Sequence, residues 1–434
     1  MSRRWPGSNA IIDPLERAPS RRLSPMKPRL LLLSYCFPPA ALPEAYLSAK
    51  RLGNLPDYDV DVVCMEPAGT GLRIDPSLDA YVSERFARVE RLVVPAGLKH
   101  VAGHKISAIF QVPGLIQVMN RKAFQTAMRL GPERYAAMVT WSQWHSIHLV
   151  GLALKKRYPR LPWIAHFSDP WSDNPFAPLR RLMRPYNRYL ETKVHRAADR
   201  LSFTSRETID LVFSGAPDAI HAKTFELPHA FESTFYPVAV PRQEGPLMLR
   251  SLGNFYGVRS PEPLFRALAI LRQRSSALVG KIRVELIGTI PDEFRNSPVL
   301  QALPADIVRI LPPVDYMSSL ALMRSADLLL NIEAPFAQSV FLPSKLVDYI
   351  GAERPVLGIT PPGTASRVIR TLGGWVAGPD DPEAIAAILE TALPQIERDR
   401  GAPWGDPDVR RSYAAAMVGE RFSKVIKDIA GGAS

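Results

Sequence analysis

The sequence contains very little cysteine: Cys36 and Cys64 are the only two among 434 residues. Both lie in apolar stretches without the spacing of a metal site, so we expect buried free thiols and no bound metal. This disfavours a disulfide-stabilised secreted domain. It is typical of a reducing compartment, and we therefore expect a cytoplasmic protein.

Long hydrophobic runs are missing as well. The longest apolar run near the start spans Leu30 to Leu33, which is far too short to cross a bilayer. Residues 1–27 are not typical of a signal peptide, because no apolar stretch follows their early arginines. We expect a disordered basic tail here; alternatively, translation starts at Met26, directly before the first predicted strand.

Acidic residues are outnumbered: 42 Asp and Glu face 54 Lys and Arg, which gives a net charge of +12. Such a balance favours anionic partners, among them phosphorylated substrates, an acidic membrane surface and nucleic acid. The basic residues are scattered and lack interleaved aromatics, so we expect no nucleic-acid partner. No Gly-x-Gly-x-x-Gly pattern follows the opening strand of either half, which disfavours a dehydrogenase.

What the sequence does contain is a long alternation of short apolar strands and helical stretches. It opens with a strand over 29–35, a helix over 43–52 and a strand over 60–65. This order predicts doubly wound parallel α/β sheets. A chain of 434 residues is too long for one core, and the polar, proline-rich stretch 236–246 is the expected domain boundary.

Two stretches of the first half are rich in basic residues. Residues 91–130 are expected to be largely helical with a basic face. Residues 180–198 are expected to form a helix, kinked or restarted at Pro185, that carries Arg180, Arg181, Arg184 and Arg188. Both stretches would suit an anionic membrane surface, and both are equally typical of solvated basic faces.

The most informative motif runs from Pro343 to Ile350 and is followed by Arg354-Pro355-Val356. It predicts a helix with Lys345 in its first turn and Asp348 three residues later on the same face. The free N–H groups of the helix start, from Ser344 onward, and the charge of Lys345 suit a phosphate. Asp348 can accept hydrogen bonds from a ribose diol. The competing interpretation is a solvated ion pair on a surface helix.

This helix follows four other motifs in a fixed order. They are Ser34-Tyr35-Cys36-Phe37-Pro38-Pro39, the stretch from Trp163 to Trp171, the stretch from Leu227 to Glu232, and the stretch from Gly253 to Pro261. Together, over about residues 29–430, the five motifs resemble the retaining GT-B glycosyltransferases of family four.

The resemblance implies two Rossmann-like domains that face each other across a cleft. The N-terminal domain (28–238) would bind the acceptor and the C-terminal domain (239–408) the nucleotide-sugar donor. Residues 409–434 would form a helix that crosses back to the N-terminal domain, and a tail. Transfer would proceed with retention and without a metal or a cofactor; the nucleotide-sugar is a substrate.

For the donor, the resemblance points to three features. They are the loop between Gly253 and Gly257, two cations that bind the diphosphate, and the helix predicted from Pro343 to Ile350. The expected donor-binding residues are Gly253, Asn254, Gly257, Arg259, Ser344, Lys345 and Asp348. One of the family's two phosphate cations matches Arg259, whereas the other falls on Asn254. The second Glu of the family's signature pair corresponds to Asp348 and the first to Val340; Glu333 is a weak substitute.

For catalysis and the acceptor, the informative position is Asp169, just past a strand end, where open α/β sheets bind ligands. We expect Asp169 to orient the acceptor hydroxyl or to contact the donor sugar. The catalytic candidates are Asp169, Arg259, Lys345 and His148, and the acceptor-binding candidates are Pro39, Glu44, His145 and Trp171. A turn or helix cap competes as an interpretation for Asp169, and packing competes for the two histidines.

The expected function is that of a hexosyltransferase that transfers a sugar, with retention, to a glycan or lipid-linked acceptor. The process would be cell-surface polysaccharide synthesis, of lipopolysaccharide or exopolysaccharide, in the cytoplasm or peripherally at the inner face of the plasma membrane. Two alternatives stay open. One is a non-catalytic subunit that binds a nucleotide or a glycan, and the other is a nucleotide-sugar epimerase on the same fold.

Overall fold

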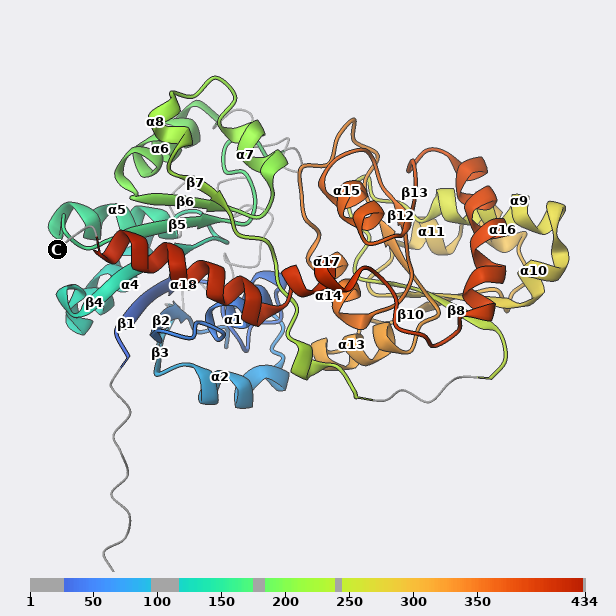
Figure 1. Ribbon diagram of the computed structural model, residues 1–434, viewed down its shortest axis with the longest axis horizontal. Coiled ribbons are helices and arrows are strands. Elements are labelled where there is room, and N and C mark those ends of the chain that lie inside the picture. Colours follow the sequence, from blue (N-terminus) through green and yellow to red (C-terminus); the bar gives the residue numbers. More distant parts are fainter. Residues whose placement is uncertain (1–26, 95–116, 175–183, 239–243, 432–434) are drawn as a thin grey trace, which may run out of the picture.

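The structure is a computed structural model that describes residues 27–94, 117–174, 184–238 and 244–431. Nearly all of the expected basic tail, together with Arg180 and Arg181, lies outside the described residues. Within them, the chain forms two parallel sheets, each with helices on both faces (Figure 1). The expected doubly wound α/β architecture is therefore confirmed.

The first sheet is built from the N-terminal half. Its strands are β1 (Arg29–Ser34), β2 (Asp59–Met65), β3 (Arg88–Leu92), β4 (Tyr135–Trp141), β5 (Trp163–Phe167), β6 (Arg200–Phe203) and β7 (Thr224–Glu226). They are ordered β3-β2-β1-β4-β5-β6-β7, and every pairing is parallel. The strand order reverses between β1 and β4, and open sheets of this kind bind ligands beyond such a switch point.

The second sheet follows the same plan in the C-terminal half. Its strands are β8 (Leu247–Leu252), β9 (Ile282–Ile287), β10 (Val308–Leu311), β11 (Leu328–Ile332), β12 (Val356–Ile359) and β13 (Trp375–Ala377). They are ordered β10-β9-β8-β11-β12-β13, so the switch point lies between β8 and β11.

Helices connect the strands and cover both sheets. Those of the first half are α1 (Pro43–Leu52), α2 (Asp79–Arg85), α4 (Gln117–Leu130), α5 (Ile147–Arg157), α6 (Arg184–Ala197), α7 (Arg206–Val212) and α8 (Asp218–His221). Those of the second half are α9 (Glu262–Arg274), α10 (Ser276–Gly280), α11 (Asp292–Arg295), α12 (Pro298–Gln301), α13 (Tyr316–Arg324), α14 (Ser344–Ala352), α15 (Thr364–Thr371) and α16 (Pro382–Arg398). Two helices close the described chain, α17 (Pro407–Ser412) and α18 (Ala415–Gly431).

Strand β1 shows why the sheets are buried on both faces. Its four consecutive leucines are fully buried. Leu31 and Leu33 belong to one hydrophobic cluster and Leu30 and Leu32 to another on the opposite face, because side chains alternate along a strand. A continuous apolar run is what a parallel strand needs when helices cover both faces.

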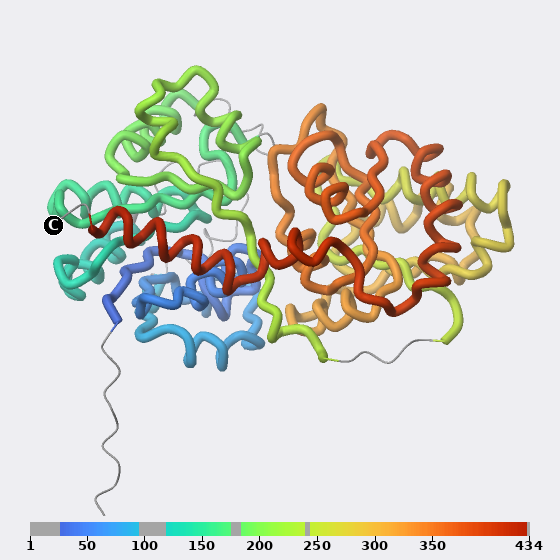
Figure 2. Tube along the Cα trace, viewed as in Figure 1, coloured from blue at the N-terminus to red at the C-terminus, as the bar shows by residue number. Residues whose placement is uncertain are grey.

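Helix α18 returns to the N-terminal half, as expected. Its apolar positions Val418, Phe422 and Ile426 recur at helical spacing and pack in the cluster that contains Leu52 of α1. The chain therefore passes twice between the halves, after β7 and before α18 (Figure 2). The two passages are joined by hydrogen bonds between Phe231 and Tyr413 (3.0 Å) and between Ala415 and Phe231 (2.8 Å).

One sequence expectation was wrong in part. Residues 91–130 were expected to be largely helical, but Arg91 and Leu92 end the edge strand β3. Charged residues are common on edge strands, where they discourage pairing with other chains, and here they hid the strand. Residues 95–116 lie outside the described residues, and α4 confirms the helix for 117–130.

Candidate functional site

A pocket lies between the two halves, with an empty volume of ≈ 940 Å³ that includes its open mouth. The N-terminal half contributes residues of α1 and of the segment before α2, and the C-terminal half contributes the loop after β8, the end of β9, α13 and the start of α14. The lining includes Pro43, Tyr46, Lys50, Asp75, Gly253, Asn254, Gly288, Asp315, Tyr316, Ser344, Lys345 and Asp348.

Two cations dominate the C-terminal side of the site. Burial, together with nearby Arg259, lowers the pKa of Lys345 to about 7, although Glu333 opposes the shift. Arg259 packs over the ring of Tyr256 at 5.0 Å, and its buried Nε has no hydrogen-bond partner. Among the described residues, neither cation forms an ion pair with a carboxylate. Lys345 lines the pocket, whereas Arg259 is partly exposed and lies outside the pocket lining. Two neighbouring positive charges without an ion-paired carboxylate favour an anion beside them.

Glycine is required where the ends of β8 and β9 meet this site. Gly253 has φ +125, and a Cβ built there would lie 2.9 Å from Lys345 Nζ. Gly288 has φ +148, and its Cβ would lie only 2.3 Å from the Gly253 carbonyl oxygen. Gly257 has φ +60 but open space around it. The close approach of two chain segments and an amine therefore requires Gly253 and Gly288.

Asn254, where the resembling family has a cation, fixes the loop. Its side-chain oxygen accepts a hydrogen bond from the backbone N–H of Thr289 at 2.9 Å. The side chain thus joins the loop after β8 to the segment after β9.

Helix α14 brings Ser344, Lys345 and Asp348 to the pocket, and Lys345 and Asp348 share a face of the helix, as predicted. Asp348 Oδ1 lies 2.7 Å from Nζ of Lys50 and accepts a hydrogen bond from the Tyr316 hydroxyl at 3.0 Å. Lys50 and Tyr316 were not predicted from the sequence. The helix pattern did not single out Lys50, because α1 also buries the polar residues Glu44, Ser48 and Arg51.

Val340 corresponds to the first Glu of the resembling family's signature pair, and its backbone carbonyl connects the two halves. The Val340 carbonyl accepts hydrogen bonds from the hydroxyls of Ser205 (2.6 Å) and Thr208 (2.9 Å) of the N-terminal half. Glu333 is buried and accepts a hydrogen bond from Thr360 at 2.7 Å. Its effect on Lys345 is therefore electrostatic and not a direct contact.

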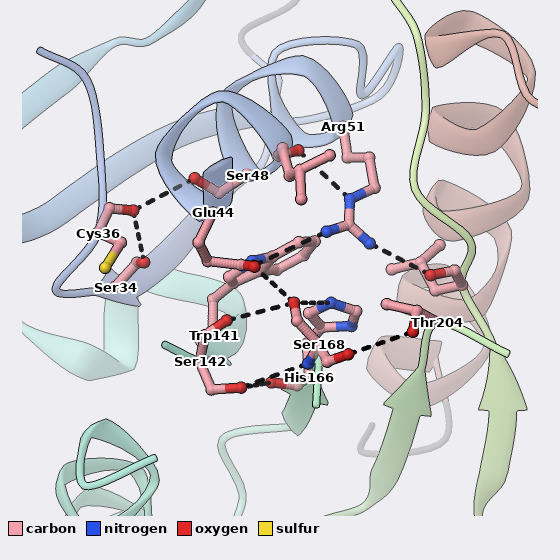
Figure 3. A network of polar contacts seen from close by, with 12 residues as sticks. Ser34, Cys36, Glu44, Ser48, Arg51, Trp141, Ser142, His166, Ser168 and Thr204 are labelled. Carbon is pink, nitrogen blue, oxygen red and sulfur yellow. Dashed lines mark hydrogen bonds and ion pairs between the residues drawn. The ribbon is translucent and has the colours of Figure 1, made fainter. Parts of the chain in front are cut away.

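A second polar network lies inside the N-terminal half (Figure 3). Glu44, in the first turn of α1, accepts hydrogen bonds from Trp141 Nε1 and from the Ser168 hydroxyl at 2.6 Å. The Arg51 guanidinium lies 3.9 Å from Glu44 and over the Trp141 ring at 4.1 Å. Burial outweighs this weak ion pair and raises the pKa of Glu44 to about 7. The buried Glu44 carboxyl thus holds the Ser168 side chain in place through a hydrogen bond.

Asp169 follows Ser168 directly and is partly exposed. It acts on the Glu44 carboxyl electrostatically, and its negative charge helps to raise the pKa of Glu44. Pro39 is also partly exposed, and its carbonyl accepts a hydrogen bond from the Asp75 N–H at 2.8 Å. Glu44 is nearly inaccessible, so its direct contacts are with protein side chains.

His145, His148 and Trp171 lie in the interior and not along the described pocket. His148 is fully buried, packs against Phe167 at 4.3 Å and shares a 2.8 Å hydrogen bond with Thr140. Burial lowers the pKa of His148 well below its ordinary value, which keeps the ring neutral. His145 stacks on Trp171 at 5.4 Å. These three rings form part of the aromatic core beside β5.

The described residues contain no group of three or more His, Cys, Asp or Glu side chains placed to hold a metal. In the part of the chain that the structure describes, the helices are too short or too polar to span a bilayer.

The sequence matches no family model, and it matches no curated protein. Solved structures are similar in fold. One is Anabaena HepE in complex with UDP, with a TM-score of 0.64 and 14% identity over 92% of this chain and 100% of that one. Another is the E. coli trehalose-6-phosphate protein bound with UDP-2-fluoro glucose, with a TM-score of 0.65 and 13% identity over 92% and 99% of the two chains.

A third similar structure is a putative UDP-N-acetylglucosamine 2-epimerase from Listeria monocytogenes, with a TM-score of 0.58 and 12% identity over 93% and 96% of the two chains. At such identities the likeness shows the fold, and the chain has the GT-B arrangement of two Rossmann-like domains.

Proposed function

We propose that this protein is a glycosyltransferase that binds a nucleotide-sugar in the pocket between its halves. The observation that carries the proposal is the pair Lys345 and Arg259, two cations without a carboxylate partner among the described residues. They lie beside the Gly253 loop, and Lys345 is at the N-terminus of α14. A diphosphate supplies the negative charge that this arrangement lacks.

The remaining donor contacts follow from the same elements. Asp348 accepts hydrogen bonds from the ribose hydroxyls, and the N–H groups at the start of α14, from Ser344, face the phosphates. UDP is the first nucleotide to test, because two structures of similar fold are complexes with UDP or a UDP-sugar.

The proposed transfer proceeds with retention and uses no metal. The bond between the anomeric carbon and the diphosphate oxygen breaks, and the bond to the acceptor oxygen forms on the same face. The acceptor proton passes to the leaving diphosphate, whose charge Lys345 and Arg259 stabilise. Asp169, at the end of β5 on the acceptor side, orients the acceptor hydroxyl. His148 is buried in the core and needs no part in this step.

The acceptor is proposed to be a glycan or lipid-linked sugar of a cell-surface polysaccharide. A structure of similar fold is a lipopolysaccharide outer core galactosyltransferase, with a TM-score of 0.55. Contact with an anionic membrane is proposed for the basic side chains of α4, among them Arg121, Lys122 and Arg129. The basic residues of α6 support it less, since Arg184 and Arg188 both pair with Asp173.

Two other functions fit the fold less well. An epimerase needs acid and base carboxylates free in the cleft. Asp75 accepts hydrogen bonds from Tyr46 and from the backbone of Tyr316 and Ser77, and Asp315 caps α13. Because both carboxylates accept structural hydrogen bonds, they are not free to act as the acid and base of an epimerase. A non-catalytic subunit would bind the nucleotide without turnover, and only an assay separates it from the transferase.

The experiment is a calorimetric titration with UDP, GDP, ADP and their common sugars. We expect saturable binding of one nucleotide, weakened at least about tenfold in Lys345→Ala and in Arg259→Ala, as for the loss of one charged contact. Lys281→Ala is the matched control, because Lys281 is exposed and pairs with Glu397 far from the pocket. Well-folded protein that binds none of these nucleotides would overturn the proposal, and binding without sugar transfer would favour the non-catalytic subunit.

A further inference from the structure

Lys50 belongs to the N-terminal half but lies at the base of the pocket proposed for the donor. Its side chain is fully buried, although it comes from the last turn of α1. Its Nζ donates to Asp348 Oδ1 at 2.7 Å and to the Tyr316 hydroxyl at 2.7 Å. Asp348 and Tyr316 belong to the C-terminal half, so the three groups form a polar cluster across the interface.

Burial of a lysine is costly unless a carboxylate compensates it. Among the described residues, Asp348 is the one carboxylate within ion-pair distance of Lys50. Burial lowers the pKa of Lys50, and the neighbouring Asp348 opposes that shift. The pair can therefore form only when the two halves are together, as they are in this structure.

The geometry leaves one carboxylate oxygen of Asp348 available. Oδ1 is used by Lys50 and Tyr316, whereas no hydrogen bond from the described residues reaches Oδ2. Asp348 lines the pocket, and its backbone carbonyl is held by the Tyr236 hydroxyl at 2.8 Å. A carboxylate has about four acceptor sites, so a ribose hydroxyl can bind while Lys50 stays in place.

We infer that Lys50 is a positioning residue for the donor: it orients Asp348 so that Oδ2 receives a ribose hydroxyl, and it thereby couples nucleotide recognition to closure of the two halves. The inference rests on the proposed nucleotide site. It goes beyond that proposal because it assigns part of the donor recognition to the opposite half of the molecule.

The test separates positioning from support of the fold. Lys50→Met keeps the length of the side chain and removes the charge, and Lys427→Met is the matched control because Lys427 is exposed and pairs with Asp57 in the same half. Each protein is titrated with UDP and with 2′,3′-dideoxy-UDP, which lacks both ribose hydroxyls, or with the corresponding GDP or ADP pair if the wild type prefers another base.

We expect Lys50→Met to weaken UDP binding by about tenfold or more, as for the loss of an oriented charge-assisted hydrogen bond. Its effect on 2′,3′-dideoxy-UDP should be below about threefold, because that ligand lacks both hydroxyls that could donate to Asp348. Lys427→Met should bind both ligands like the wild type.

Equal weakening for both ligands would mean that Lys50 only supports the fold, and it would overturn the inference while the proposed site stands. A wild type that binds no nucleoside diphosphate would overturn the proposed function as well. Should Lys50→Met fail to fold, Tyr316→Phe removes the other donor to Oδ1, keeps the ring stacked on Tyr46 at 4.3 Å, and should show the same selective loss.

Discussion

Lys50, which is buried, and Lys345, which is partly buried, line one pocket but have opposite surroundings. Lys50 has the Asp348 carboxylate at 2.7 Å, whereas Lys345 has Arg259 nearby and no ion-paired acid among the described residues. The positive charge of Lys50 is therefore balanced by the Asp348 carboxylate within the protein. Within the described part of the chain, Lys345 has no such ion-paired carboxylate, which is why the anion is proposed to bind at Lys345.

Lys345 leads to a prediction about protons. Its pKa of about 7 leaves much of the amine neutral above neutral pH, and a bound diphosphate raises that pKa by favouring the charged form. Binding at pH 8 should therefore take up as much as about one proton, and affinity should fall as the pH rises above 7. Calorimetry in two buffers with different ionisation enthalpies measures the uptake. Lys345→Met, which retains the titration of the ligand itself, should lose it; equal uptake in both proteins would contradict the assignment.

Glu44 leads to a prediction about stability. Its pKa is about 7 when folded and near 4.5 in its ordinary state, so the folded chain binds more protons between these values. The contribution of Glu44 to stability therefore falls as the pH rises through that window. Glu44→Gln should gain stability relative to the wild type between pH 4.5 and 8, by up to roughly 3 kcal/mol.

Denaturant unfolding of both proteins at several pH values measures this difference. Glu191, whose pKa burial also raises to about 7, is present in both proteins and cancels. A difference that does not change with pH would show that the Glu44 carboxyl is not shifted.

At the scale of elements, the loop after β8 and the N-terminus of α14 form one unit. Gly253 is the contact between them: its φ of +125 favours glycine, and a Cβ there would displace the Lys345 amine. The alternation of short apolar strands with helical stretches made most strands and helices predictable from the sequence. Strand β3 was missed because its charged residues, on an edge strand, resemble the polar face of a helix.

Substitution of the two loop glycines should therefore have unequal effects. Gly253→Ala combines a backbone strain of about 1–3 kcal/mol with displacement of Lys345, and it should weaken nucleotide binding at least about tenfold. Gly257→Ala has φ +60 and free space, so it should cost about 1 kcal/mol of stability and little affinity. Unfolding curves and nucleotide titrations of both variants test this, and equal losses of affinity would refute a specific role of Gly253.

At the scale of the molecule, side-chain contacts join the two halves in two separate places. Lys50, Tyr236 and Asp348 join them near the paired chain passages. Ser205 and Thr208 of α7 join them elsewhere through the Val340 carbonyl, and Arg367 binds Glu207 through two hydrogen bonds of 2.8 and 3.0 Å. The two halves are therefore in direct contact in this structure.

Loss of the Val340 contact should favour opening. A Ser205→Ala/Thr208→Val variant removes two hydroxyl donors to that carbonyl together with the N-cap of α7. We expect a larger radius of gyration by small-angle scattering in the absence of nucleotide. Ser297→Ala is the control, since it removes the N-cap of α12, also worth about 1 kcal/mol, without touching the interface. An unchanged radius would show that this contact does not hold the halves.

The return of the last helix was an expectation of the family resemblance, whereas local patterns in the sequence determined the parallel α/β elements and the shared face of Lys345 and Asp348 on α14. They did so because periodicity and motif spacing act over a few residues. Tertiary structure alone decided which groups meet across the halves. Lys50 and Asp348 are 298 residues apart, and Ser205 and Val340 are 135 apart. It also decided that His145, His148 and Trp171 lie in the aromatic core and that Glu44 is enclosed by Trp141 and Ser168, because burial depends on how distant elements pack and not on local spacing.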